Sequence, residues 1–128
     1  MVITVLPTIS SPYHDPSAVR GPVQTVGLQT KTINSFPVSQ NSSGIVRAYV
    51  WGIDSAFTLI TGGAVQASFL RAAGNVALQG NPVASMIGSL TGVVALVANT
   101  TAQTIELQVT GVALTTIDWY VVAYPFVK

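Results

Sequence analysis

Few residues in this chain have side chains that commonly carry catalysis, and they lie far apart. The single histidine, His14, stands beside Asp15 in the proline-rich stretch SSPYHDPSAVRGP, where hydroxyl groups are also close. A nucleophile and a base can be drawn from this stretch. However, a carboxylate adjacent in sequence cannot orient its neighbour's imidazole as the acid of a catalytic triad does. We therefore interpret His14 as a polar turn residue.

The acidic residues give no clear catalytic pair either. They are Asp15, Asp54, Glu106 and Asp118. We expect Glu106 and Asp118 to lie on two strands of one hairpin, where their carboxylates could approach each other as in a glycosidase. That chemistry also needs a groove of polar and aromatic groups, so we interpret both as solvent-facing strand residues. Alternatively, each pairs with Arg47 or Arg71 at a subunit boundary.

Metal, cofactor and nucleic-acid sites lack the residues that they need. The chain contains no cysteine and no Asp-x-Asp or Glu-x-x-His spacing, which leaves few metal ligands. The glycines of GNPVASMIG, residues 80–88, lack the lysine and the spacing of a phosphate-binding loop. The net charge is +1 and the basic residues are scattered, which argues against nucleic-acid binding. We predict no enzyme activity and no cofactor.

Aromatic residues offer one candidate binding site, for a sugar. Trp51, Asp54 and Phe57 lie close together in the sequence and form a candidate glycan-facing loop. The second tryptophan, Trp119, alternates with apolar residues along the last strand-like segment, so we expect it to pack in the core.

The composition favours assembly with other chains. Only 7% of the 128 residues are charged, against about 25% in ordinary soluble proteins, and a surface covered by other subunits needs less charge. No apolar run approaches the ~20 residues of a membrane-spanning helix. The opening residues MVITVLPTISSP lack a basic leader. We expect a protein that is made in the cytoplasm, retains its N-terminus and does not bind a membrane.

The elements that would position any site are predicted to be strands. From residue 45 onward, strand-length apolar segments alternate with Gly, Asn and Ser, and no amphipathic helix is present. We read Gly62-Gly63 as a break between two strands and residues 80–82 as a turn. Residues 83–90 could form a helical turn or an irregular strand. About eight such strands predict an all-β sandwich or barrel.

The N-terminal part looks different. Four of the seven prolines lie in residues 1–22, which favours extended, irregular backbone. We therefore divide the chain into an extended N-terminal arm and loop, residues 1–40, and a β-sandwich domain, residues 41–128. The arm either lies across a neighbouring molecule or is a frayed tail.

The last strand raises a question about its second face. One face is apolar and consists of Ile117, Trp119, Val121 and Ala123; the other consists of Asp118, Tyr120, Val122 and Tyr124. A strand in a two-layer β fold normally has one wet face. Either a neighbouring subunit or a second sheet of the same subunit should cover the tyrosine-rich face.

The stretch from residue 73 to residue 124 resembles a C-terminal pattern of tailed-bacteriophage virion proteins, and the match as a whole covers roughly residues 45–124. The pattern L-x-V-T-G-x-A-x-T-T-I-x-W is carried here by Leu107, Val109, Thr110, Gly111, Ala113, Thr115, Thr116, Ile117 and Trp119. The proteins that it resembles are trimeric jelly rolls similar in shape to tumour necrosis factor domains, found on tail fibres, head fibres and capsid decorations. This chain departs from the pattern in its more apolar ending, WYVVAYPF, and in lacking a fibrous shaft.

The resemblance implies a fold and a function. It implies an antiparallel jelly-roll sandwich that forms a homotrimer, with Tyr120, Val122 and Tyr124 as candidate contacts between subunits. It implies a place on the virion, as a capsid decoration or cement protein bound to the major capsid protein or neighbouring virion proteins. The candidate capsid-contact residues of the arm are Val2, Ile3, Val5, Tyr13, His14 and Arg20.

Other functions stay open at this stage. A receptor-binding head spike or tail appendage would read a host glycan with the Trp51–Phe57 loop. A secreted carbohydrate-binding or cytokine-like module is a third possibility, and an enzyme the last.

Overall fold

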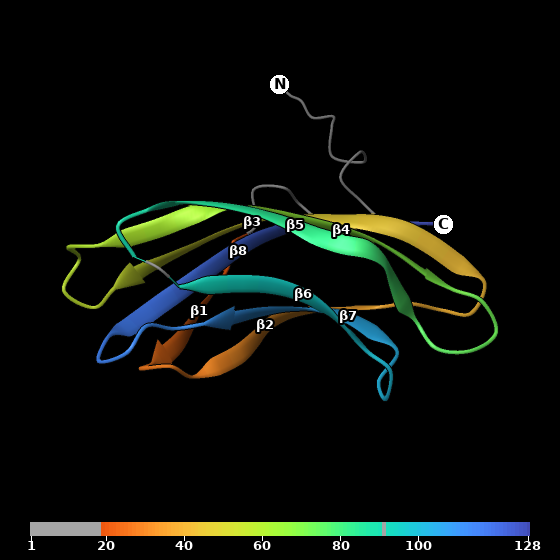
Figure 1. Ribbon diagram of the computed structural model, residues 1–128, viewed down its shortest axis with the longest axis horizontal. Coiled ribbons are helices and arrows are strands. Elements are labelled where there is room, and N and C mark those ends of the chain that lie inside the picture. Colours follow the sequence, from red (N-terminus) through yellow and green to blue (C-terminus); the bar gives the residue numbers. More distant parts are fainter. Residues whose placement is uncertain (1–18, 91) are drawn as a thin grey trace, which may run out of the picture.

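The computed structural model describes residues 19–90 and 92–128, whose regular elements are eight strands (Figure 1). The strands are β1 (Arg20–Val26), β2 (Thr30–Pro37), β3 (Ser42–Asp54), β4 (Ile60–Arg71), β5 (Ala77–Gly88), β6 (Val93–Asn99), β7 (Thr104–Thr110) and β8 (Thr116–Val127). Within these ranges no helix is long and apolar enough to cross a membrane.

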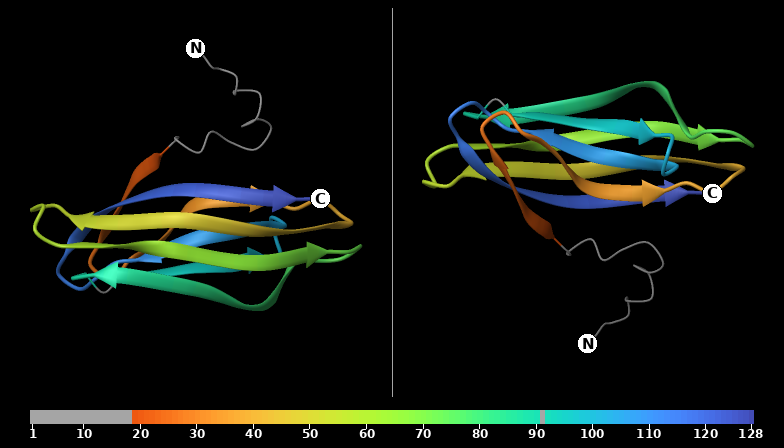
Figure 2. Two further views of the ribbon diagram at one scale, coloured as in Figure 1. Left: turned by 90° about the horizontal axis from the view of Figure 1, so that it is seen from above. Right: turned by 90° about the horizontal axis from the view of Figure 1, so that it is seen from below.

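The strands form two antiparallel sheets that pack face to face (Figures 1 and 2). Sheet A has the order β1-β8-β3-β4-β5, and sheet B has the order β2-β7-β6. The expected eight-stranded antiparallel sandwich is confirmed. The first strand pairs with the last and the second with the seventh, a nested arrangement that jelly rolls share, while β3, β4 and β5 follow one another as a meander.

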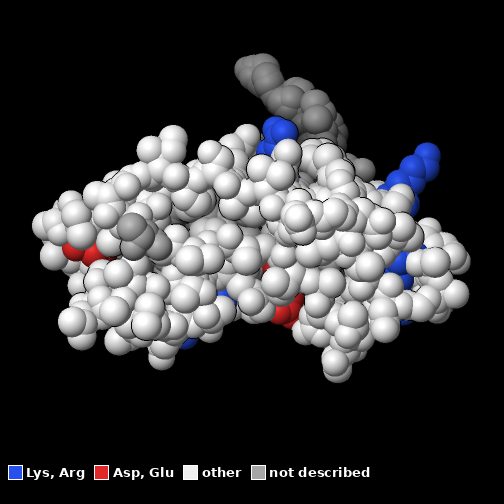
Figure 3. Space-filling view, viewed as in Figure 1, with Lys and Arg blue, Asp and Glu red and all other residues white. Residues whose placement is uncertain are grey.

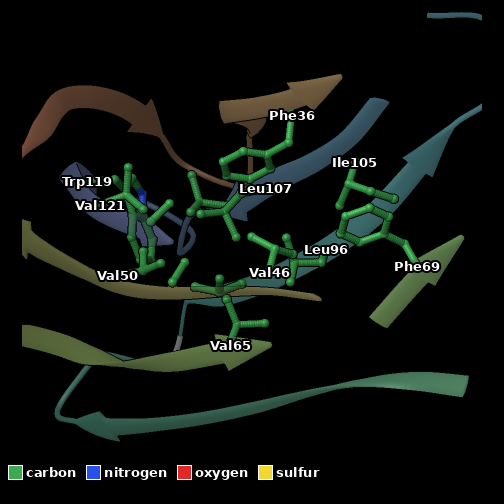
Figure 4. Packing of buried hydrophobic residues seen from close by; sticks show 14 of the residues in the cluster. Phe36, Val46, Val50, Val65, Phe69, Leu96, Ile105, Leu107, Trp119 and Val121 are labelled. Carbon is green, nitrogen blue, oxygen red and sulfur yellow. The ribbon is translucent and has the colours of Figure 1, made fainter. Parts of the chain in front are cut away.

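The core lies between the two sheets because each strand turns its apolar face inward. In β7 the alternation is complete: Ile105, Leu107 and Val109 are fully buried, whereas the residues between them are not. Sheet A contributes the inward residues of β3, β4 and β8 (Figure 4). The largest fully buried side chains include Trp119, Phe69, Leu96, Ile105, Leu107 and Ile117.

Trp119 is a core residue, as the alternation in β8 predicts. Its side chain is fully buried, and its indole Nε1 donates a hydrogen bond to Thr25 Oγ1 at 2.9 Å. Thr25 is also fully buried. This bond satisfies both polar groups inside the core and ties β1 to β8.

The expected hairpin of the last two strands is wrong. β7 lies in sheet B and β8 in sheet A, so residues 111–115 cross from one layer to the other. Each strand has its own apolar face, and the two faces meet across the core instead of lying side by side. Glu106 and Asp118 therefore belong to the outer faces of opposite sheets, and they cannot form a catalytic pair.

The expected domain boundary at residue 40 is also wrong. Residues 20–37 supply β1 and β2, which pair with β8 and β7. The proline-rich residues 1–22 suggested irregular backbone, but Pro22 belongs to β1 and Pro37 to β2, both edge strands, where a missing N–H breaks no interior ladder. The sandwich thus begins at Arg20. Residues 1–18 lie outside the described part of the chain.

Two glycine-containing segments predicted to interrupt strands lie inside them. Gly62 and Gly63 are part of β4. An added Cβ at Gly63 would collide with the backbone carbonyl of Ser85 on β5, so glycine permits the close approach of the two strands. Residues 80–82, expected as a turn, form a bulge, since the register shifts between Gln66 and Ser68 opposite them. For residues 83–90 the sequence allowed either a helical turn or an irregular strand. Residues 83–88 continue β5 as a strand.

Candidate interaction surface on the outer face of sheet A

The outer faces of the two sheets differ in chemistry. On sheet B, Glu106 Oε2 accepts a hydrogen bond from Asn99 Nδ2 at 2.8 Å, and Oε1 accepts from Thr32 Oγ1 and Gln108 Nε2, both at 3.3 Å. These bonds, that from Asn99 first, lower the pKa of Glu106 below its ordinary value. This face is therefore a polar network of the kind expected beside water.

The outer face of sheet A is aromatic where β3 and β8 lie side by side. Tyr49 and Tyr124 meet edge to face with their ring centroids 6.0 Å apart. Trp51 stacks on Tyr120 with a centroid distance of 5.5 Å and an interplanar angle of 20°. Two cross-strand aromatic pairs thus form one continuous surface, which we call the aromatic face. The left view of Figure 2 looks onto sheet A from this side.

The aromatic face continues into aliphatic residues. On β3, β4, β5 and β8 the exposed large hydrophobic residues that alternate with core residues are Ile45, Tyr49, Ile60, Leu70, Val83, Ile87 and Phe126. Among the described residues no element covers this face, because sheet B packs on the opposite side. The sequence left open whether a second sheet or a neighbouring subunit covers the tyrosine-rich face of β8. No described sheet of the same subunit covers it.

Arg47 is the charged residue in the middle of the aromatic face. Its Nε and Nη2 donate to Gln66 Oε1 at 3.2 and 3.1 Å, and it lies opposite Tyr124 in the β3–β8 register. A shallow hollow of about 410 Å³ lies between Arg47 and its neighbours Ile45, Tyr49, Tyr124 and Phe126. In the view of Figure 3, charged residues occupy only small, separated parts of the surface.

The three candidate contacts between subunits lie on this face, but they contribute unequally. Tyr120 and Tyr124 are half-buried by the aromatic partners described above. Val122 is only 9% exposed because its neighbours cover it. Tyr49, 45% exposed, was missed by the sequence reasoning and offers more surface. The signal was present in IVRAYVW, where Arg47, Tyr49 and Trp51 alternate with core residues.

The candidate glycan-facing residues do not converge. Trp51 is on the sheet, stacked on Tyr120. Asp54 Oδ1 accepts from the backbone N–H groups of Thr58 and Leu59 at 2.7 and 2.9 Å, and Oδ2 accepts from Thr58 Oγ1 at 2.7 Å. These bonds, that from Leu59 first, lower the pKa of Asp54. Only Phe57 projects from the loop, with 79% of its surface exposed.

The arm candidates separate into two groups. Arg20 is the first residue of β1 and pairs with Val121, so it belongs to sheet A instead of to an arm. The other candidates, Val2, Ile3, Val5, Tyr13 and His14, lie outside the described residues.

The described part of the chain offers little for metal or acid–base chemistry. No group of three His, Cys, Asp or Glu side chains lies close enough there to hold a metal ion. A hollow of about 580 Å³ lies between Ser43, Phe69, Gln79 and Phe126, with Lys128 at its edge. No Asp or Glu side chain lines it.

Comparisons with known proteins show a distant structural similarity. No known family and no curated protein matches the sequence. Among solved structures, the chain is similar to the tailspike protein of Acinetobacter baumannii phage AM24, with a TM-score of 0.45 and 7% sequence identity. The alignment covers 84% of this chain and 26% of the tailspike chain, so the chain spans about a quarter of that protein. At this level of similarity, the comparison assigns no function.

Proposed function

We propose that this chain is a non-enzymatic structural protein of a phage virion, a capsid decoration protein that trimerises through the aromatic face. The observation that carries the proposal is the pair of aromatic contacts, Tyr49–Tyr124 and Trp51–Tyr120, on an outer sheet face that no described element covers. Tyrosine and tryptophan are enriched in protein interfaces because they combine a large contact area with a polar group.

The size of the face fits a contact between subunits. The strands β3, β4, β5 and β8 contain 12 or 13 residues each, which corresponds to a length of about 40 Å, and four strands side by side span about 19 Å. The product is on the order of 760 Å², close to the ~800 Å² per partner of a stable protein–protein interface. Three copies whose faces meet around a threefold axis would each bury a surface of this size.

The charge distribution supports burial of this face. Arg47 already has a hydrogen-bond partner in Gln66 on the same face, so covering it leaves its guanidinium partly satisfied. The polar network around Glu106 lies on sheet B, where it would stay in water. On β3, β4, β5 and β8 the second charged residue of this outer face is Asp118, and its Oδ1 accepts a hydrogen bond from Gln24 Nε2 at 3.2 Å, so it too keeps a partner when the face is desolvated.

The number of subunits and the place on the virion rest on the sequence pattern. The motif that ends at Trp119 resembles trimeric phage virion proteins. A trimer that contacts capsid proteins at three equivalent points gains avidity that a single contact lacks. Bridging neighbouring capsid subunits in this way would resist their separation.

The proposal is tested by counting copies in purified virions and by changing the face. We expect a decoration protein to be present in hundreds of copies per particle, as judged from a stained gel. The double variant Tyr49→Ser/Tyr124→Ser should be lost from particles. Val93→Ser is the matched control, because Val93 is an exposed apolar residue on the outer face of sheet B. A few copies per particle would instead favour the receptor-binding spike, and loss of both variants would refute a specific role of the aromatic face.

A further inference from the structure

Three loops meet at one end of the sandwich. They are the β1–β2 loop (residues 27–29), the β3–β4 loop (55–59) and the β7–β8 loop (111–115). The backbone N–H of Gly27 donates to the Thr115 carbonyl at 3.0 Å, and that of Gly111 donates to the Gln29 carbonyl at 3.0 Å. Ser55 is joined in the same way to Thr116 at 3.0 Å. These bonds place the three loops side by side, and we call this the apolar end.

Each of the three loops exposes a large apolar side chain. Leu28 is 69% exposed, Phe57 is 79% exposed and Leu114 is fully exposed. The sequences of the loops, GLQ, SAFTL and GVALT, contain no charged residue. The nearest carboxylate, Asp54, is bonded to its own loop. Apolar side chains therefore dominate the surface at this end.

The backbone adds a second, independent observation. Phe57 and Leu114 adopt positive φ angles of 59° and 61°. This left-handed region is costly for a bulky L-residue, and glycine or asparagine is usual there. The side chains of Phe57 and Leu114 are exposed, so packing within the subunit does not compensate for the cost of this backbone conformation. A function at these two positions would explain why the conformation is kept.

The opposite end shows that this pattern is not general. There the apolar loop residues Val38 and Val76 are buried, and the left-handed positions carry the polar residues Asn41 and Gln103. Gln103 also has a structural role, because its side chain bonds to the backbone N–H of Val76 and to the Asn75 side chain, both at 2.8 Å. Among the described loops, only those of the apolar end expose large apolar side chains.

We propose that the apolar end is the base through which the trimer attaches to an apolar protein surface of the virion; this inference rests on the proposed function. In a cyclic trimer, equivalent residues of all three subunits lie at the same height along the axis. The three ends therefore form one ring. One end exposes an apolar area on the order of 400–500 Å², less than the ~800 Å² per partner of a lasting contact, whereas three ends together exceed it.

Two other occupants fit the observations less well. An anionic membrane is normally bound through lysine and arginine residues next to the inserted side chains, and the three loops contain none. A second trimer would have to accept protruding side chains with an end that itself protrudes at Leu28, Phe57 and Leu114. A separate protein with apolar pockets has no such restriction.

The test measures binding of the purified chain to virus particles assembled without it. The double variant Phe57→Gly/Leu114→Gly removes both side chains and suits the backbone at both positions, and Leu28→Ser repeats the test at an ordinary backbone position. We expect each to bind at least tenfold more weakly while the mass in solution is unchanged. Asn41→Gly is the matched control at the opposite end, with the same backbone conformation (φ 59°), and should bind as the unmodified chain does.

The outcomes separate the inference from the proposed function. If the unmodified chain does not bind the particles, the proposed function fails and the inference with it. If it binds and the loop variants bind equally well, only the inference is overturned. Two other results would also overturn the inference. If the unmodified chain floats with phosphatidylcholine vesicles and the loop variants do not, the apolar end binds a membrane. If the unmodified chain has the mass of six protomers and the loop variants that of three, the apolar end binds a second trimer.

Discussion

Replacing Leu114 by glycine should stabilise the fold, although it removes a large apolar side chain. Leu114 has a φ of 61° and is fully exposed, so its truncation loses no buried contact. Relieving the left-handed conformation of an L-residue recovers about 1–2 kcal/mol. The greater freedom of glycine in the unfolded chain offsets roughly 0.5–1 kcal/mol of this. The net gain is on the order of 0.5–1 kcal/mol, or a rise in melting temperature of about 2–6 °C for a domain of this size.

Two control variants isolate the backbone effect. Leu114→Ala keeps the strained conformation and should change the free energy of unfolding by less than about 0.5 kcal/mol. Gly27→Ala should have the opposite sign: Gly27 has a φ of 60° and an added Cβ would meet nothing within 4 Å, so a loss of about 1 kcal/mol would come from the backbone alone. Urea unfolding followed by circular dichroism measures all three. A lower stability of Leu114→Gly would refute the reasoning, because it would show that the side chain supports the fold.

Three further predictions concern the core, the strand spacing and pH. Thr25→Val should lower the free energy of unfolding by about 1–3 kcal/mol, because it leaves the buried Trp119 N–H unsatisfied; in a Trp119→Phe background the same change should cost nothing, and an equal cost there would contradict the role of the bond. Gly63→Ala should lower stability by about 1–3 kcal/mol through the collision with β5, and an unchanged thermal midpoint would contradict the close approach of the strands. The pKa values of Asp54 and Glu106 are lowered in the folded state, so the stabilisation that their ionised carboxylates give is present above the ordinary carboxyl pKa of about 4 and is lost as the pH falls below it, through the lowered pKa values. Melting temperatures that stay level down to pH 3 would contradict it.

Alternation along the chain made much of the fold predictable. In β7 and β8 the period of two identified the buried residues, Trp119 among them, because each strand presents one face to the core. The same rule applied to β3 would have identified Tyr49 and Trp51 as outward-facing.

Features that depend on partners distant in the sequence were not predictable in the same way. The proline-containing β1 and β2 are strands only because β8 and β7 offer them an edge, and local preference alone favours irregular backbone. The assignment of β7 and β8 to different sheets likewise depends on how two apolar faces meet. The left-handed Phe57 and Leu114 carry no sequence signal, because their residue types disfavour that conformation.

The central claim, assembly through the aromatic face, is tested most directly by the mass in solution, measured by light scattering. The measurement compares the full chain, a chain that begins at residue 19, and Tyr49→Ser/Tyr124→Ser, with Val93→Ser as the control. Deletion of residues 1–18 leaves β1 complete. We predict three protomers for the full chain, the shortened chain and the control, and a single protomer for the double variant. A single protomer for the full chain, or a trimer that survives the double variant, would contradict it.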